Sequence, residues 1–216
     1  DEVFGSLEGN KVFDEYAKYD PRSPYSATKA ASDHLIRAWN YTYGLPTIIT
    51  NCTNNYGPWQ FPEKLIPLVI LKAIEGKTIP LYGDGKNIRD WLYIEDHVDA
   101  LLLASMKGIP GSTYCIGGEN EKTNREVIER ICLLLDERRP THSPHSSLIK
   151  LVMDRPGHDK RYAISPRKIK DELGWSIKYT FEKGITETVN WYLNNLKWCK
   201  EVTHASAYNG ERLGLG

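Results

Sequence analysis

Hydrophobic and polar positions follow two different rhythms along the chain. Short apolar runs between turn-forming residues are typical of buried strands, and longer segments with apolar residues every three or four positions are typical of amphipathic helices. The pattern predicts strands in the ranges 46–52, 78–83, 112–118 and 148–154. It predicts helices in the ranges 25–43, 63–76, 95–108, 124–137, 165–174 and 180–193. Beyond these lies a polar, glycine-containing tail.

Local signals support several of these helix boundaries. Pro24 suits a first helical turn, and Gly44 ends the same segment. Thr123 and Glu126 have the spacing of a capping box, whereas Pro67 favours a regular helix that starts near it. Strands and helices that alternate in this way predict an α/β architecture with a largely parallel sheet.

The charge balance narrows the classes of partner. The chain has 216 residues, with 28 Lys and Arg against 28 Asp and Glu, so its formal net charge is zero. A neutral chain lacks the basic stripe that attracts nucleic acid or an anionic membrane. Its longest apolar run, 65–71, is too short to cross a bilayer, and the first residues lack the order of a signal peptide. We therefore expect a cytoplasmic protein with neither a nucleic-acid nor a membrane partner.

Metal chemistry finds little support in the sequence. The four cysteines are widely spaced among apolar neighbours, which is typical of buried thiols rather than of disulfides or zinc ligands. His142 and His145 are three residues apart, but no third ligand is near them. We predict no metal site.

The stretch "SPYSATKAASDHLIRAW" places Tyr25 and Lys29 one helical turn apart, on the same face. A cation beside a phenol stabilises the phenolate, so this pair could form a general base. The spacing alone also fits a core tyrosine next to a surface lysine.

The surrounding motifs add to this interpretation. "SPYSATKAASDHL" followed by "PTIITNCTNNYGP" resembles the catalytic helix and next strand of the extended short-chain dehydrogenase/reductase family. "FPEKLIPLVI", "YGDGKNIRDWLYIEDH", "DRPGHDKRYAI" and "YNGERLGL" look like the dTDP-glucose 4,6-dehydratases within it, and the likeness covers essentially the whole chain. The resemblance implies a partial Rossmann-like, doubly wound parallel sheet with a smaller α/β substrate-binding domain.

The resemblance also implies catalytic roles. Tyr25 would take a proton from a sugar hydroxyl, and Lys29 would anchor the ribose of NAD. Hydride would leave carbon 4 of dTDP-glucose to NAD as that proton is taken. Asp1 as acid and Glu2 as base would then eliminate water across carbons 5 and 6, and return of the hydride to carbon 6 would give dTDP-4-keto-6-deoxyglucose. Without the resemblance, a terminal Asp-Glu would be interpreted as a solvated pair. An epimerase at carbon 4 would not need these two acids.

Further residues match binding positions of the family. Asn54 would touch substrate and Asn55 the cofactor side, although both also suit a turn. The other implied substrate contacts are Lys64, Leu65, Pro80, Leu81, Tyr82, Arg89, Asn124, Asp154, Arg155, Pro156, Gly157, His158 and Tyr208. Among these, the tyrosine in "IPLYG" would face the thymine base, and the arginines and histidine would hold the diphosphate. Each also has an ordinary structural interpretation as a core, cap or solvated residue.

The resemblance sets the expected domain organisation. Residues 1–60 would be the C-terminal part of an NAD-binding domain, and 61–216 mainly a sugar-nucleotide domain with segments that return to the Rossmann sheet. No G-x-G-x-x-G follows a predicted strand, so we expect a portion that lacks the N-terminal half of the family's fold. Another nucleotide-sugar epimerase or dehydratase, or a module that binds the sugar nucleotide without turnover, remain alternatives. The resemblance also implies a homodimer through the Tyr25 helix.

Overall fold

The computed structural model describes residues 1–154, 157–206 and 208. The chain forms two compact units. Unit 1 consists of Asp1–Asn55, Asn87–Lys122 and Arg155–Phe181, and unit 2 of Tyr56–Lys86, Thr123–Asp154 and Glu182–Gly216. The division at residue 60 that the sequence suggested stays a prediction.

The order of elements matches the predicted alternation. Along the chain they are η1 (Glu2–Phe4), α1 (Pro24–Tyr43), β1 (Ile49–Cys52), β2 (Asn54–Tyr56), α2 (Leu65–Ile74), β3 (Ile79–Tyr82), β4 (Ile88–Tyr93), α3 (Ile94–Lys107), β5 (Thr113–Ile116), β6 (Glu121–Thr123), α4 (Asn124–Arg138), η2 (His145–Leu148), β7 (Ile149–Val152), α5 (Arg167–Leu173), α6 (Phe181–Asn194) and α7 (Leu196–Ala205). Every predicted helix and strand is present, with ends that differ by a few residues.

Two expectations are wrong. The segment after α6 is not only a polar tail, because α7 forms there and buries Cys199. The asparagines expected in a turn form the short strand β2, which lies beside β4 in a three-stranded sheet. The helix near Pro67 begins two residues earlier, at Leu65; Pro67 therefore stands in the first turn, where a missing N–H costs no helical hydrogen bond.

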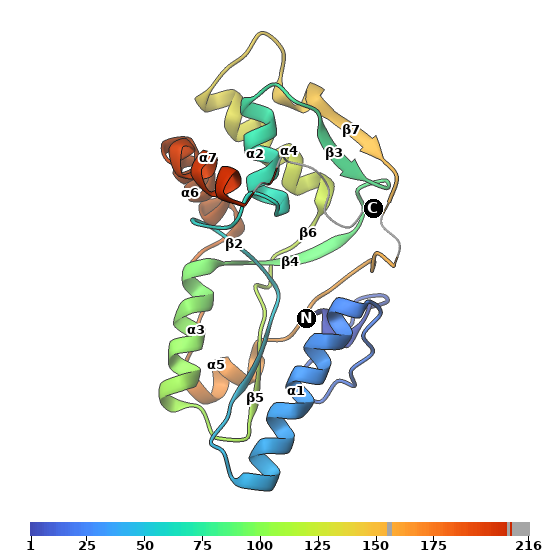
Figure 1. Ribbon diagram of the computed structural model, residues 1–216, viewed down its shortest axis with the longest axis vertical. Helices are drawn as coiled ribbons and strands as arrows, with labels where there is room; N and C mark the ends of the chain where they lie inside the picture. Colours follow the sequence, from blue (N-terminus) through green and yellow to red (C-terminus); the bar gives the residue numbers. More distant parts are fainter. Residues whose placement is uncertain (155–156, 207, 209–216) are drawn as a thin grey trace. The chain divides into compact units, whose positions relative to one another are not determined.

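Unit 1 has a layer of apolar side chains on each face of a parallel strand pair. β1 pairs with β5 from Ile49↔Thr113 to Cys52↔Ile116. Because neighbouring strand residues point to opposite faces, Tyr114 and Ile116 join a core cluster with α3 and α5, whereas Cys115 joins a second cluster with η1 and α1. Figure 1 shows β5 with α3 and α5 on one side and α1 on the other. This layering suits an open parallel sheet covered by helices.

The end of β5 requires glycine. A Cβ on Gly118 would lie 2.2 Å from the carbonyl oxygen of Trp91, so no larger residue fits there. The Gly118 N–H donates to the buried carboxylate of Asp90 at 2.7 Å, and the Asn120 N–H donates to its other oxygen at 2.7 Å. Burial raises the pKa of Asp90, and these two donors oppose that rise. This contact joins β4 to the loop that follows β5.

Unit 2 is built on a second parallel pair, β3 and β7, with register from Ile79↔Ile149 to Tyr82↔Val152. α2 packs against both α4 and β3. Ion pairing and hydrogen bonding tie α4 to α6, through Arg130 with Glu182 at 2.7 Å and Arg138 with Asn190 at 2.6 Å. The fully buried apolar side chains of α2, α4 and α6 include Ile66, Ile70, Ile128, Ile131, Leu135, Ile185 and Val189.

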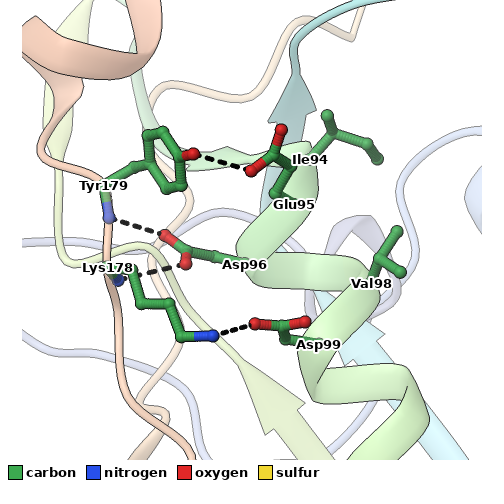
Figure 2. A pocket seen from close by; sticks show the side chains of 7 residues that line it. All are labelled: Ile94, Glu95, Asp96, Val98, Asp99, Lys178 and Tyr179. Atoms are coloured by element: carbon green, nitrogen blue, oxygen red, sulfur yellow. Dashed lines mark hydrogen bonds and ion pairs between the residues drawn. The ribbon is translucent and has the colours of Figure 1, made fainter.

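A carboxylate clasp fastens the start of α3 to the segment after α5 (Figure 2). Asp96 is 1% exposed, and its two oxygens accept the backbone N–H groups of Lys178 and Tyr179 at 3.0 Å each. The side chains of these two residues also reach α3, where Tyr179 donates to Glu95 and Lys178 pairs with Asp99. A pocket of about 440 Å³ is lined by Ile94, Glu95, Asp96, Val98, Asp99, Lys178 and Tyr179. Because its polar groups bond one another, we interpret it as a structural junction.

We expect Asp96→Ala to lower the free energy of unfolding by about 3 kcal/mol, since two buried N–H groups would lose a charged acceptor. Asp96→Asn should cost less, because its amide retains one acceptor oxygen. Urea unfolding of the purified protein measures both variants. A loss below about 1 kcal/mol for Asp96→Ala would show that water replaces the carboxylate.

Candidate active site

The start of α1 presents the tyrosine and lysine outward. Ser23 caps the helix in a reciprocal capping box with Ser26, and Pro24 occupies the first turn. Ser26 and Ala30 are buried, whereas Tyr25 and Lys29, each one residue earlier and about 100° away around the helix, are exposed. Tyr25 is 63% exposed, which rules out its interpretation as a core tyrosine.

The segment that carries the acid pair, Asp1 and Glu2, packs against α1 and bonds to the end of β1. Glu2 belongs to η1, whose residues Val3 and Phe4 share a core cluster with Ala30 of α1. The Asp1 nitrogen donates to the carbonyl oxygen of Cys52, the last residue of β1, at 2.9 Å. Unit 1 therefore brings the backbone of the acid pair to the carboxyl end of β1, where open α/β sheets bind ligands.

Buried polar atoms gather at this strand end. Within the described residues, Asp1 Oδ2, Thr53 Oγ1 and Asn54 Oδ1 are buried without a hydrogen-bond partner. Asn55 Nδ2 bonds Cys52 Sγ and the Thr53 carbonyl oxygen, both at 3.2 Å. Buried polar groups in native proteins are nearly always satisfied, so three such atoms from adjacent segments indicate a place for a polar ligand.

Arg89 lies in the same unit, at the second position of β4, and is 7% exposed. Its guanidinium donates to the carbonyl oxygens of Asp159 at 2.9 Å and Lys160 at 3.4 Å, and lies 4.4 Å from the centre of the Tyr162 ring. Burial is the largest cause that raises the pKa of Tyr162. The hydrogen bond and charge of Asp159 raise this pKa further, as does the charge of Glu2. Glu2 is therefore within electrostatic reach of the group around Arg89.

The glycine and histidine of "DRPGH" precede this group in unit 1, and Gly157 has a left-handed φ of 66°. Arg155 and Pro156 lie outside the described residues.

Unit 2 holds a second group of the predicted residues. Tyr82 ends β3, and a Cβ on the next residue, Gly83, would lie 2.9 Å from Asp154 Oδ2. Tyr208 lies 5.8 Å from the ring of Phe61; its pKa is raised by burial, then by Glu63 and Tyr82. Tyr82, Asp154 and Tyr208 are therefore gathered around the end of β3.

The remaining unit 2 residues have more ordinary surroundings. Lys64 pairs with Glu63 at 3.0 Å and precedes Leu65, the first residue of α2. Asn124 is the first residue of α4. Pro80 is partly exposed in β3, but Leu81 is 1% exposed and its side chain fills the space beside Gly85. A core position of this kind leaves the Leu81 side chain no surface to offer a ligand.

Three residues that belong with these groups were not found from the sequence. Thr53 lies between two predicted positions, yet an isolated threonine carries no pattern. Asp159 directly follows "DRPGH" and Tyr162 lies three residues further along, so closeness to this motif was the available signal. Among the described residues, no cluster of three or more His, Cys, Asp or Glu side chains could hold a metal ion, and no helix could span a membrane.

The fold and these side chains define a Rossmann-type α/β protein with an outward Tyr–Lys pair on α1 and an acid pair in the segment whose η1 turn packs against α1. The family model described as GDP-mannose 4,6 dehydratase matches residues 1–188, so the chain belongs to this family.

Relatives and solved structures agree with that assignment. The chain is 56% identical to a dTDP-glucose 4,6-dehydratase of Xanthomonas campestris pv. campestris, over 99% of this chain and 61% of that protein. It is 56% identical to dTDP-glucose 4,6-dehydratase 1 of Escherichia coli K12, over 94% of this chain and 58% of that protein. The chain thus spans about 60% of the length of these curated relatives.

Two solved structures show the same fold. A crystal structure of dTDP-glucose 4,6-dehydratase from Bacillus anthracis in complex with NAD has a TM-score of 0.86 and 50% identity, over 93% of this chain and 62% of that one. A Thermus thermophilus UDP-glucose 4-epimerase complex with NAD has a TM-score of 0.79 and 27% identity, over 89% of this chain and 61% of that one. The predicted fold class is confirmed.

Proposed function

We propose that the intact protein is an NAD-dependent dTDP-glucose 4,6-dehydratase. The observation that carries this proposal is the placement of Asp1 and Glu2 at the end of β1, packed through η1 against the helix that bears Tyr25 and Lys29. The names of the relatives at 56% identity support the same substrate. The UDP-glucose 4-epimerase structure is less similar, at 27% identity, and epimerisation at carbon 4 would not need the acid pair.

The residues present fit a nicotinamide cofactor. Lys29 offers an exposed ammonium that can donate to ribose hydroxyls, and Asn55 lies in β2, where its Nδ2 bonds Cys52 Sγ and the Thr53 carbonyl oxygen. NAD, when bound, would accept hydride from carbon 4 of the sugar and return it to carbon 6. Tyr25 would take the proton of the carbon-4 hydroxyl, while Lys29 stabilises the phenolate.

The acid pair would then eliminate water. A ketone at carbon 4 makes the proton on carbon 5 acidic, so Glu2 as a carboxylate can remove it. Asp1 as a carboxylic acid can protonate the carbon-6 hydroxyl, which leaves as water. Two neighbouring carboxyl groups in opposite protonation states are needed, and different environments can set those states. Asp1 has a buried oxygen, whereas the charge of Glu2 acts on Tyr162, so their environments differ.

The test is turnover by the full-length protein with NAD and dTDP-glucose. We expect a 4-keto product, seen by its absorbance in alkali, and slower turnover of GDP-mannose and UDP-glucose as matched control substrates. Binding of dTDP-glucose without a keto product would favour the binding module. A carbon-4 epimer as product would favour the epimerase.

We further propose that the protein is a homodimer through α1. Leu35, Trp39 and Tyr43 follow one another at four-residue intervals along this helix, and are 58%, 52% and 79% exposed. A stripe of this kind can pack against the same stripe of a second copy across a twofold axis. The cytoplasmic location stays a prediction.

Sedimentation velocity tests the dimer. We expect the intact protein to sediment as a dimer, and Leu35→Glu with Trp39→Glu to shift it to monomer, because charges would be buried at the interface. Leu102→Glu is a matched control on α3, at 55% exposure. A wild-type monomer, or a dimer that survives both α1 changes, would contradict the interface.

A further inference from the structure

In unit 1, a closed ring of interactions joins the guanidinium of Arg89 to two further residues, Asp159 and Tyr162. The Arg89 Nη2 donates to the Asp159 carbonyl oxygen at 2.9 Å. The Tyr162 hydroxyl donates to the Asp159 carboxylate at 2.5 Å, and the Tyr162 ring lies 4.4 Å from the guanidinium carbon. The hydrogen bond from Arg89 to the Asp159 carbonyl oxygen fixes the rotation of the guanidinium in its plane, and the face of the Tyr162 ring fixes the tilt of that plane. Together these contacts leave the Arg89 side chain little freedom.

The backbone that carries Asp159 and Tyr162 is itself anchored on two sides. On one side it bonds to Ile88, the first residue of β4. The Ile88 N–H donates to the Lys160 carbonyl oxygen at 2.8 Å, and the Tyr162 N–H donates to the Ile88 carbonyl oxygen at 3.3 Å. On the other side Leu7 N donates to Arg161 O at 3.0 Å, so the segment that begins with the acid pair runs along it. The ring around Arg89 is therefore held by backbone hydrogen bonds on two sides within unit 1, and the charge of the proposed base Glu2 acts on its Tyr162.

We propose that Asp159 and Tyr162 are positioning residues that aim Arg89 at the diphosphate of a nucleoside diphosphate ligand. Asp159 directly follows His158, one of the proposed diphosphate contacts, and Arg89 is another. A guanidinium binds phosphate well only when its fork is correctly oriented. The ring couples that orientation to the end of the "DRPGH" segment. The proposal rests on the proposed function, which supplies the ligand class.

The test measures binding of dTDP to the full-length protein by titration calorimetry. We expect Tyr162→Phe, which keeps the aromatic face and removes the hydroxyl, to raise Kd about tenfold, equivalent to about 1.4 kcal/mol. Asp159→Ala should act similarly. Asp159→Asn should stay within about twofold of wild type, because its amide oxygen still accepts from the Tyr162 hydroxyl.

A double-mutant cycle shows whether Tyr162 acts through Arg89. In an Arg89→Lys background, Tyr162→Phe should change Kd less than about twofold, because the orientation of the fork no longer matters. Tyr179→Phe is the matched control, since it also removes a tyrosine–carboxylate hydrogen bond in unit 1 but in the clasp at α3. It should leave Kd unchanged.

The outcomes separate this inference from the proposed function. Wild-type binding of dTDP with Kd unchanged in Tyr162→Phe and Asp159→Ala would overturn the positioning role and leave the function standing. Additive effects of Arg89→Lys and Tyr162→Phe would overturn it too. A lowered melting temperature with unchanged Kd would show a merely structural role. If the wild-type protein binds no dTDP, both proposals fail.

Discussion

Replacing Tyr25 with phenylalanine should lower kcat with dTDP-glucose by about 10³-fold, within the range that proton transfer by a positioned side chain contributes. Only the phenol oxygen is lost, so the residue can no longer take the proton of the carbon-4 hydroxyl. Because Tyr25 is 63% exposed at the start of α1, the change should leave the fold intact. The melting temperature and the Kd for dTDP are expected to stay near wild-type values.

The same helix offers a matched control. Tyr41 lies near the other end of α1 and is 87% exposed, so Tyr41→Phe removes a hydroxyl from the same element far along it from Tyr25. Its kcat should equal that of the wild type. Turnover by Tyr25→Phe within about tenfold of wild type would mean that another group takes the proton.

Local sequence signals predicted the elements that depend on nearby residues. The Ser23 and Pro24 start of α1, its end at Gly44 and the Thr123–Glu126 capping box are all as expected, since each depends on hydrogen bonds within a few residues. α7 was missed because its polar residues suggested a tail, although Leu196 and Cys199 give it an apolar side. β2 was missed because asparagines favour turns, and pairing with β4 outweighs that preference.

The candidate site was predictable only where a motif carried it. Tyr25 and Lys29 could be placed on one face from their spacing. The ring around Arg89 could not be predicted, because it joins residues about 70 positions apart in the sequence through contacts that no local pattern encodes. The burial of Leu81 likewise follows from how β3 packs against the turn at Gly85. Chemistry-bearing residue types are visible in a sequence, whereas the contacts that orient them arise from tertiary packing.

The second large effect is expected at the acid pair. Glu2→Gln should lower the rate of dehydration by about 10²- to 10⁴-fold, because an amide cannot remove the proton from carbon 5. In deuterated water the wild-type product should carry deuterium at carbon 5, and this exchange should vanish with Glu2→Gln. Glu8→Gln, an exposed carboxylate in the same N-terminal segment, should behave as wild type.

Asp1→Asn separates the roles of the two acids. Its amide cannot protonate the departing hydroxyl, so dehydration should fall to a similar degree while Glu2 still exchanges the carbon-5 proton with solvent. Deuterium at carbon 5 of recovered substrate, measured by NMR, is therefore expected with Asp1→Asn and absent with Glu2→Gln. Exchange that persists in Glu2→Gln and vanishes in Asp1→Asn would reverse the assignment of acid and base. Normal dehydration in both variants would show that the acid pair takes no part in the elimination. The acid pair would then no longer distinguish a dehydratase from an epimerase on this fold.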